Sequence, residues 1–332
     1  MKRTLAHLMV DYLERRGVEF VFGLCGHTNI AFLDALKDSS KIRFISVRHE
    51  QIAATAADGY ARVKGKTGVV LTHLGPGLTN AVTGVANAAM DSVPMVVIAG
   101  DVPSYYYGRH PHQEFNMHSD ASQYEIYRPF VKRAWRLERA DLAPQILDRA
   151  FRLAESGRPG PTLISVPMDL FSEHVDESLF ERTYRDSGCT RPPAISRETA
   201  LAIAKALIEA ERPVIHVGGG VLAARATEQL QELAEHLSIP VSRTLMGQGA
   251  MSDLHPLMLG MTGFWGTKFT NSMTASANLI LALGTRFAEA DSSSWYEGVT
   301  FSNKSRVIQV DIDVAEIGRN YPVEIGAVAD LK

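Results

Sequence analysis

Glu50 is the side chain with the clearest capacity for proton chemistry, because it lies where an apolar run gives way to an alanine-rich one. The order KIRFISV and then RHEQIAATAADGYAR predicts a strand followed by a helix from His49 to about Val63. A carboxylate at a helix start is often only a favourable partner for the helix dipole. In an apolar pocket, burial would instead raise the pKa of this carboxyl group, whereas the helix end lowers it. If the effect of burial is the larger one, the group can share a proton. The sequence leaves both interpretations open.

Two glycine-containing turns follow other predicted strands. The turn LGPGLTN, residues 74–80, lies between a buried strand and a helix of small residues, where glycine lets the backbone approach a ligand closely. The turn GLCGHTN, residues 23–29, places Cys25 and His27 just after the first strand of this kind. The Cys25 thiol could be reactive, or it could be a small buried filler.

A polar, aromatic segment over residues 105–124 is rich in histidine. Its candidate metal ligands are His110, His112, Glu114 and His118. Their spacing, H-x-H-x-E-x-x-x-H, does not fit the helical HExxH pattern of zinc sites. We therefore expect a solvated active-site loop and no metal site.

A glycine run in the second half suggests a phosphate-binding turn. The sequence HVGGGVLA, residues 216–223, satisfies G-x-G-x-x-A after a predicted strand. The acidic residue expected ~20 residues later in a nicotinamide site is missing, and Val241-Ser242-Arg243 stands there. The assignment of a dehydrogenase function would depend on this glycine run alone. The run could also be a tight strand-to-helix turn, and a different nucleotide at the same edge stays open.

The elements that must position these residues alternate along both halves of the chain. Apolar runs such as EFVFGL, TGVVLT, PMVVIAG and PTLISVP alternate with helical patterns in the first half, as PVIHVGGG, ANLILALG and RVIQVDID do in the second. This alternation predicts an α/β fold with two doubly wound parallel-sheet domains. The charged stretch 172–195 ends in a proline pair and predicts a linker between domains 1–171 and 196–332.

Length, composition and charge exclude several classes. The 332 residues are enough for two domains, at about 150 residues each. With 45% hydrophobic and 21% charged residues, each can form a core, unlike a disordered or fibrous chain. The net charge of -3 gives no case for nucleic acid or a membrane surface. No apolar run spans a bilayer. Two cysteines make no disulfide framework and fit a reducing cytoplasm.

Taken together and in order, the motifs resemble the acetolactate synthase family of thiamin-diphosphate enzymes. The first half carries the resemblance in VFGLCGHTN, RHEQIAATAADGYAR, LGPGLTNAVTGVANAAMDSVPMVVIAGDVP and HQE. The second half carries it in PVIHVGGG, TLMGQGA, LGMTG, LALGTRF and VDIDVAEIGRNYPVEIG. The resemblance extends over essentially all 332 residues and implies a pyrimidine-binding domain followed by a Rossmann-like central domain.

The resemblance implies roles for residues of the first domain. Glu50 matches a buried glutamate that hydrogen-bonds N1′ of the cofactor's aminopyrimidine and so promotes proton removal from thiazolium C2. Gln113 matches a glutamine that faces the reaction centre. The implied cofactor-binding residues are Cys25, Gly26, His27, Gly75, Pro76 and Asn80. Cys25 stands where the family usually has proline, and His73-Leu74 stands where acetolactate synthases have Thr-Ser, so the donor substrate stays open.

The central domain of acetolactate synthases holds FAD in a non-redox role, whereas other family members bind another nucleotide or none. The residues that match positions lining that flavin pocket are Gly219, Thr244, Leu245, Met246, Gly263, Gly284, Arg286, Asp311 and Ile312. The run Ala288-Glu289-Ala290 replaces the family's Asp-Asp-Arg. The resemblance therefore implies FAD or another nucleotide here.

The resemblance also implies a third domain, which binds the diphosphate and Mg²⁺ through a GDG motif, and this sequence contains no GDG. We expect the N-terminal part of a larger enzyme, inactive alone, whose site needs a second copy of the full-length subunit in a dimer or tetramer. The implied reaction forms or cleaves a carbon–carbon bond beside the carbonyl of a 2-oxo acid or similar small donor. The alternative is a non-catalytic nucleotide-binding or regulatory subunit of a split enzyme.

Overall fold

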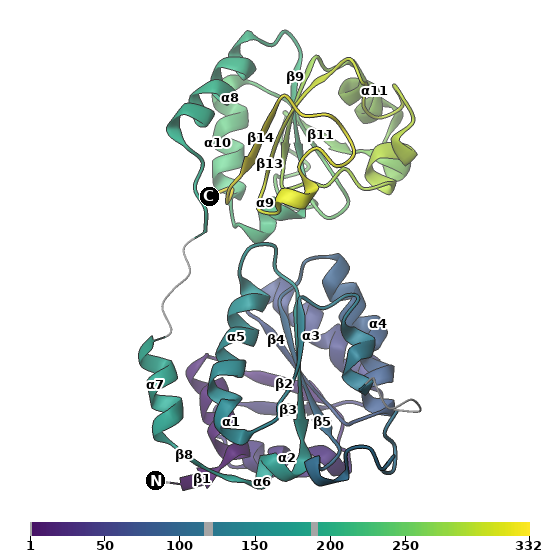
Figure 1. The fold of residues 1–332 in the computed structure, drawn as a ribbon. Helices are drawn as coiled ribbons and strands as arrows, with labels where there is room; N and C mark the ends of the chain where they lie inside the picture. Colours follow the sequence, from purple (N-terminus) through teal and green to yellow (C-terminus); the bar gives the residue numbers. More distant parts are fainter. Residues whose placement is uncertain (1, 116–121, 187–191) are drawn as a thin grey trace. The chain divides into compact units, whose positions relative to one another are not determined.

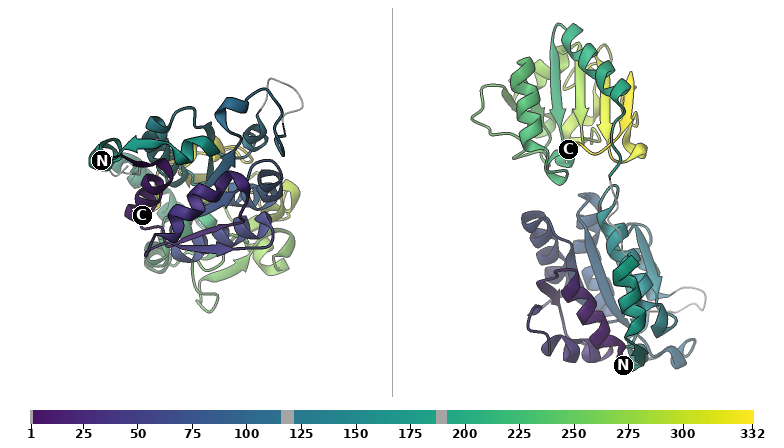
Figure 2. Two further views of the ribbon diagram at one scale, coloured as in Figure 1. Left: turned by 90° about the horizontal axis from the view of Figure 1, so that it is seen from below. Right: turned by 90° about the vertical axis from the view of Figure 1, so that its left-hand side faces the viewer.

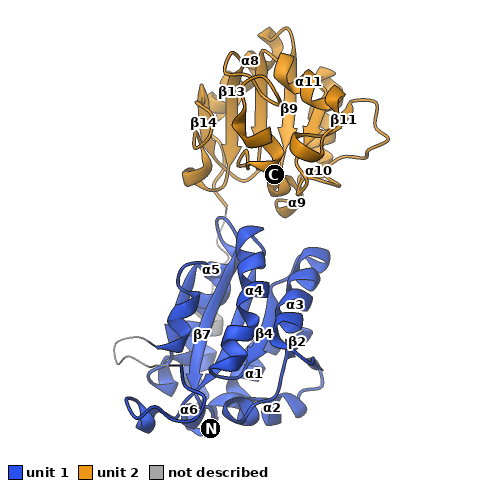
Figure 3. Ribbon diagram, turned by 90° about the vertical axis from the view of Figure 1, so that its right-hand side faces the viewer, with its two compact units in different colours: residues 1–190 blue, residues 191–332 orange. Residues whose placement is uncertain are grey.

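The computed structural model describes residues 2–115, 122–186 and 192–332. The chain divides into two compact units, residues 1–190 and 191–332 (Figure 3). Each unit contains one six-stranded parallel sheet with helices packed against it (Figure 1). The predicted α/β fold with two parallel-sheet domains is therefore confirmed.

The first unit is built around a sheet with the order β3-β2-β4-β5-β7-β6, in which all neighbours are parallel. Its strands are β1 (Lys2–Thr4), β2 (Phe20–Gly23), β3 (Arg43–Ser46), β4 (Gly68–Thr72), β5 (Met95–Asp101), β6 (Arg133–Arg136), β7 (Pro161–Pro167) and β8 (His174–Asp176). Its helices are α1 (Leu5–Arg15), α2 (Ile30–Lys37), α3 (Glu50–Lys64), α4 (Pro76–Met90), α5 (Ala143–Glu155), α6 (Met168–Ser172) and α7 (Ser178–Asp186).

Both faces of this sheet are buried, as the continuous apolar strands require. On one face, Val69 and Leu71 of β4 pack with α1, α2 and α5. On the other face, Val70 packs with the alanine-rich α3 and the small-residue helix α4. Gly84 of α4 comes so close to α3 that a Cβ there would lie 2.6 Å from the Cβ of Ala54. Small side chains therefore let α3 and α4 pack together on one face.

The strand order of the sheet reverses at the carboxyl ends of β2 and β4. After β2 the chain turns to its neighbour β3, and α3 then carries it back to β4 on the other side of β2. In open parallel sheets, ligands bind where the strand order reverses in this way. The turns 23–29 and 73–77 both leave the sheet at this point.

The segment 172–195 differs from the predicted linker in its first part. Strand β8 pairs antiparallel with β1, and α7 follows it. Val175 and Phe180 are buried in the same core as α1 and α5. The sequence hides this packing because the buried apolar side chains Val175 and Phe180 are isolated within an otherwise charged stretch. Cys189 lies outside the described residues.

The second unit has the sheet order β11-β10-β9-β12-β13-β14, again parallel throughout (Figure 2). Its strands are β9 (Pro213–Val217), β10 (Val241–Arg243), β11 (Met258–Met261), β12 (Leu279–Leu283), β13 (Arg306–Asp311) and β14 (Ile325–Val328). Its helices are α8 (Arg197–Glu209), α9 (Gly219–Ala223), α10 (Thr227–Leu237) and α11 (Lys268–Ser276). Its strand order reverses between β9 and β12, where the glycine run lies. None of the described helices is long and apolar enough to cross a membrane.

Candidate functional site

Glu50 is the first residue of α3 and is buried, with 5% of its surface exposed. Asn80 of α4 donates from Nδ2 to Glu50 Oε2 at 3.0 Å. Within the described part of the chain, Oε1 has no hydrogen-bond partner. A Cβ at Gly77 would lie 3.3 Å from that oxygen, so glycine keeps the space beside it open. One carboxylate oxygen is thus fixed by the protein, and the other is available to a ligand.

The turn between β4 and α4 is held by a loop some forty residues further along the chain. Gly75 has a φ of +50°, and a Cβ there would lie 1.9 Å from the backbone oxygen of Gln113, so no other residue fits. Its N–H donates to Gln123 Oε1 at 2.8 Å. Pro76 opens α4 at the first helical position, where its missing N–H costs nothing.

His73 connects the turn after β2 to the turn after β4. Its Nδ1 lies 2.8 Å from Thr28 Oγ1, and its Nε2 lies 2.8 Å from Gln113 Oε1. Gly26 packs against the same ring, because a Cβ at Gly26 would lie 2.3 Å from it. The turn 23–29 and Gln113 therefore meet on this histidine.

His27 lies beside His73 and in turn contacts His112. The His27 ring contacts His73 edge-on at a centroid distance of 4.6 Å and stacks on His112 at 6.2 Å. Partial burial and the two neighbouring rings lower the pKa of His27. Cys25 is a free, exposed cysteine, so it is not the small buried filler that the sequence allowed.

The carboxyl end of β5 supplies residues that the sequence analysis did not single out. Asp101 is fully buried and accepts hydrogen bonds from Val102 N, Gln123 Nε2 and Ser165 Oγ at 2.8–2.9 Å. Arg136 Nε lies 3.1 Å from the same carboxylate. Because Gln123 bonds both Asp101 and the N–H of Gly75, this cluster also fixes the turn at Gly75. In the sequence, the cluster is indicated by an aspartate at the end of a continuous apolar strand.

The loop that the sequence assigned to an active site borders this cluster. Burial and the nearby Asp101 raise the pKa of Glu114, against the charges of Arg136 and His110. His118 lies outside the described residues. Among the described side chains, no group of three His, Cys, Asp or Glu residues is placed to hold a metal ion.

The glycine run of the second unit is used largely for packing. A Cβ at Gly218 would lie 2.3 Å from the backbone oxygen of Gly284, and one at Gly220 would lie 2.6 Å from its Cα. Gly220 N donates to Gly284 O at 3.1 Å. Gly219 is less confined, with Met246 Cβ 3.3 Å from a built Cβ. The tight-turn interpretation therefore accounts for Gly218 and Gly220.

Arg243 occupies the strand end where a nicotinamide site would have an acid. Its Nε and Nη2 each lie 3.1 Å from one carboxylate oxygen of Asp253. The arginine is buried, so this ion pair takes up most of its guanidinium. Neither the charge nor the geometry matches a ribose-binding carboxylate.

The other predicted residues of the second unit lie along the same carboxyl edge. Leu245 and Met246 follow β10 and are 44% and 37% exposed, whereas Thr244 is buried. Leu245 N donates to Asp291 Oδ1 at 3.1 Å. Burial raises the pKa of Asp291, although this hydrogen bond and the charge of Arg286 each act to lower it.

Gly263 joins this edge, because a Cβ there would lie 1.9 Å from Ala290 O. Gly284 has a φ of +55° at the end of β12. Asp311 ends β13, is buried and accepts from Asp313 N at 2.9 Å; Ile312 follows it, half-buried. The edge thus combines exposed apolar side chains with the positive charge of Arg286.

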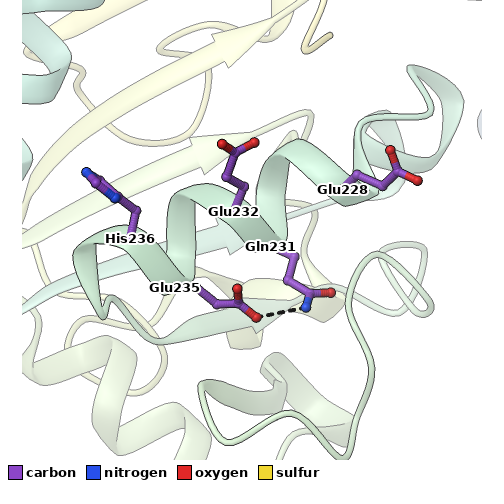
Figure 4. Close-up of a pocket in the computed structure, with 5 residues that line it drawn as sticks. All are labelled: Glu228, Gln231, Glu232, Glu235 and His236. Carbon is purple, nitrogen blue, oxygen red and sulfur yellow. Dashed lines mark hydrogen bonds between the residues drawn. The ribbon is translucent and has the colours of Figure 1, made fainter.

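A hollow lies along α10, but it contains none of the predicted site residues. Its lining residues are Glu228, Gln231, Glu232, Glu235 and His236 (Figure 4). Gln231 Nε2 donates to Glu235 Oε1 at 2.8 Å. These side chains form a solvated acidic helix face and offer no buried polar partner to a ligand.

Comparison with known proteins agrees with this architecture. Residues 3–122 match the N-terminal TPP binding domain of thiamine pyrophosphate enzymes, and residues 201–332 match their central domain. The chain is 37% identical to the acetolactate synthase of Arthrospira platensis over 99% of its own length and 56% of the relative's. It is 39% identical to a probable acetolactate synthase large subunit of Methanococcus aeolicus, over 98% of this chain and 53% of that one.

An acetolactate synthase isozyme 1 large subunit of Escherichia coli is 37% identical, with 99% of this chain and 56% of the relative aligned. The chain spans about half the length of the curated relatives it matches, and the matched residues do not include the expected third domain. The predicted resemblance is confirmed: the chain belongs to the thiamine pyrophosphate enzymes, with their N-terminal and central domains, and resembles acetolactate synthase large subunits over its whole length.

Proposed function

We propose that this chain is part of a thiamin-diphosphate-dependent enzyme that forms or cleaves a carbon–carbon bond beside the carbonyl of a 2-oxo acid. The observation that carries the proposal is Glu50, a buried carboxylate with Oε2 held by Asn80 and Oε1 free. The free oxygen beside Gly77 can take a further hydrogen-bond partner from a ligand. A ring nitrogen of the cofactor's aminopyrimidine would supply that partner.

The surroundings of Glu50 suit a flat aromatic ring. Gly77 leaves room beside Oε1, and Glu50 is buried, with 5% of its surface exposed. Burial favours a proton shared between the carboxyl and a ring nitrogen, because water would compete for it. The residues present therefore fit the pyrimidine half of thiamin diphosphate.

Each residue of this site has a distinct part in the proposed reaction. Glu50 would share a proton at Oε1 with the ring nitrogen, while Asn80 keeps the carboxyl group in place. Gly26 and Gly75 keep the backbone turns close, and Gln113 presents a polar side chain. His27, which contacts His73, and the exposed Cys25 on the same turn would border the donor. When bound, thiamin diphosphate supplies an electron sink for the carbon beside the carbonyl.

The diphosphate and its Mg²⁺ require partners that the described side chains do not supply. Within residues 2–115, 122–186 and 192–332, no carboxylate and histidine group is placed to hold a metal ion. We propose that a further domain binds them, and that a second copy of the full-length subunit brings that domain to Glu50. The cytoplasmic location suggested by the reduced cysteine stays a prediction.

The second unit offers a surface for a planar nucleotide at its carboxyl edge. Leu245 and Met246 are exposed there, as are Phe264 and Trp265 on the loop after β11. Arg286 adds a positive charge near Asp291. These groups fit FAD or another nucleotide, whereas Gly218 and Gly220 pack against protein backbone. A nicotinamide dinucleotide is therefore less favoured.

The test is Glu50→Gln in the full-length protein, assayed with pyruvate, thiamin diphosphate and Mg²⁺. We expect turnover to be nearly abolished with the fold intact, because glutamine cannot exchange a proton. Glu228→Gln is the matched control, since Glu228 also lies in the first turn of a helix but is exposed. An unchanged rate in Glu50→Gln would contradict the proposal.

A nucleotide-binding or regulatory subunit without its own chemistry is the second candidate. It is favoured by the exposed apolar edge of the second unit. If it is correct, the 332-residue chain binds FAD or an adenine nucleotide, and no longer form of the protein exists in its source cell. Intact mass spectrometry of the protein purified from that cell decides between the two.

A further inference from the structure

His73 is a buried histidine at the carboxyl end of β4 whose two ring nitrogens both have partners. Only 7% of its surface is exposed. Thr28 Oγ1 lies 2.8 Å from Nδ1, and Gln113 Oε1 lies 2.8 Å from Nε2. A neutral imidazole donates a hydrogen bond from one nitrogen and accepts one at the other. The two contacts of His73 therefore run in one of two directions, according to which ring nitrogen carries the proton.

We take the direction in which the Thr28 hydroxyl donates to His73 and Gln113 Oε1 accepts from it, and the hydrogen bond from Leu74 is compatible with this direction. Leu74 N donates to Thr28 Oγ1 at 3.4 Å, so the oxygen of this hydroxyl is an acceptor on that side. Its hydrogen is then free to point at His73 Nδ1. With Nδ1 accepting, the ring proton lies on Nε2 and is donated to Gln113 Oε1.

The backbone of Gln113 is held as firmly as its side chain. Gln113 has a φ of +67°, in the left-handed region that non-glycine residues seldom adopt. Its carbonyl oxygen packs where a Cβ of Gly75 would be. Such conformations persist where the surroundings fix them, and they gather at functional sites.

The result is that the Gln113 amide has only one orientation open to it. Its oxygen accepts from His73, whereas its nitrogen donates no hydrogen bond within the described residues. We propose that His73, set by Thr28, is a positioning residue that turns the NH₂ group of Gln113 toward the reactants. The amide would then donate to a carboxylate or developing oxyanion of the donor. This proposal rests on the proposed function of the same site.

The first arm of the test measures the tautomer of His73 without any substrate. The 332-residue chain is labelled with ¹⁵N-histidine, and the His73 signals are assigned by their absence in His73→Gln. We expect the neutral Nε2–H form at neutral pH, and a changed tautomer ratio in Thr28→Val. An Nδ1–H ring or an imidazolium in the wild type overturns the proposal.

The second arm is a double-mutant cycle on kcat/KM with pyruvate in the full-length protein. We expect Gln113→Ala and His73→Asn each to lower kcat/KM by about 10²-fold, the cost of one donor to an oxyanion. The pair should lose no more than Gln113→Ala alone, because His73 acts through Gln113. Additive losses overturn the proposal, since they indicate a separate structural role.

Two variants keep the cycle interpretable. His73→Gln has an amide long enough to reach the Nε2 position, so it should recover much of the activity that His73→Asn loses. His236→Asn makes the same exchange on the exposed face of α10 and should leave turnover unchanged. If the wild type turns over no 2-oxo acid, the proposed function fails, and the tautomer still decides the contact between His73 and Gln113.

Discussion

Among the described residues, Asn80 is the one hydrogen-bond partner of the Glu50 carboxylate, and it determines the orientation of the free oxygen. Asn80 Nδ2 donates to Oε2 at 3.0 Å across the packed pair α3 and α4. Asn87, two turns further along α4, donates to Asp58 Oδ2 at 3.3 Å in the same way. Asn87 is exposed, however, so water can replace its hydrogen bond. A comparison of Asn80 with Asn87 therefore distinguishes a hydrogen bond within the candidate site from an ordinary surface hydrogen bond.

We predict that Asn80→Ala lowers the free energy of unfolding by about 1–3 kcal/mol, because a buried acceptor on Glu50 loses its donor. Asn87→Ala should change it by less than about 0.5 kcal/mol. Urea unfolding of the two variants measures both effects. Equal effects would show that Glu50 is less dependent on Asn80 than its burial implies.

His216 is a second buried histidine, but it belongs to a core and not to a site. It stacks on Phe287 at 5.6 Å and contacts Phe301 edge-on at 5.0 Å. Its Nδ1 lies 3.0 Å from Ser242 Oγ. Complete burial lowers the pKa of His216 to about 3. The folded protein thus holds this ring neutral.

We predict a loss of stability on acidification that is specific to His216. Its folded pKa lies below the unfolded value of about 6.5, so the unfolded chain takes up the proton first. Stability therefore falls from about pH 6.5 toward pH 3, by up to ~1.4 kcal/mol per pH unit. Urea unfolding between pH 7 and 5 should show a flatter dependence in His216→Gln than in the wild type. His236→Gln, at an exposed position, should keep the wild-type slope.

At the scale of elements, the sequence predicted strands such as β4, β5 and β7, because each is a continuous apolar run that is buried at every position. Strands with partly exposed, less apolar sequences, such as β6 and β11, were not predicted. The turns after β2 and β4 were also placed correctly from their glycines. Two features were not predictable. Strand β8 and helix α7 depend on pairing with β1 and on two anchors, Val175 and Phe180.

The second unpredicted feature is the contact of His73 with both Thr28 and Gln113, which lie 45 and 40 residues away in sequence. Sequence motifs indicated which residues form the site, but not which of them touch. Contacts of this kind arise from strand order, and a local pattern carries no information about it. The orientation of the Gln113 amide therefore required the structure.

Substitutions in the glycine run after β9 can distinguish a packing role of these glycines from a phosphate-binding role. A Cβ at Gly220 would lie 2.6 Å from the backbone of Gly284, which cannot move cheaply, whereas Gly219 faces only Met246 at 3.3 Å. We predict that Gly220→Ala lowers the free energy of unfolding by about 1–3 kcal/mol. Gly219→Ala should be nearly neutral in urea unfolding. If Gly220→Ala is neutral as well, the run is not needed for packing, and a phosphate-binding role regains support.

At the scale of the whole molecule, each unit has cores of its own. Two buried clusters cover the faces of the first sheet, and two others belong to the second unit. Each unit can thus present a carboxyl edge to a ligand without borrowing core residues from the other. The described contacts of Glu50, with Asn80 and beside Gly77, include no Lys or Arg side chain that could hold a diphosphate.

This charge balance leads to a prediction about Mg²⁺. A diphosphate needs cations or a cradle of N–H donors, and the chain has a net charge of -3 with no metal-binding group among the described side chains. We expect the 332-residue chain to bind thiamin and thiamin diphosphate with equal, low affinity, whether or not Mg²⁺ is present. The full-length protein should bind only the diphosphate form tightly, and only with Mg²⁺.

Isothermal titration of both proteins, with Mg²⁺ or with EDTA, measures these four affinities, and thiamin serves as the matched ligand without phosphate. Weak binding by the 332-residue chain and tight, Mg²⁺-dependent binding by the full-length protein would indicate that the diphosphate-binding site lies outside residues 1–332. Glu50 would remain the proposed partner of the pyrimidine. Glu50→Gln should then weaken thiamin binding by the chain itself, because that contact requires no further domain. Tight, Mg²⁺-dependent binding by the 332-residue chain would instead mean that a diphosphate site exists within it, and the proposed division of the cofactor between domains would be wrong.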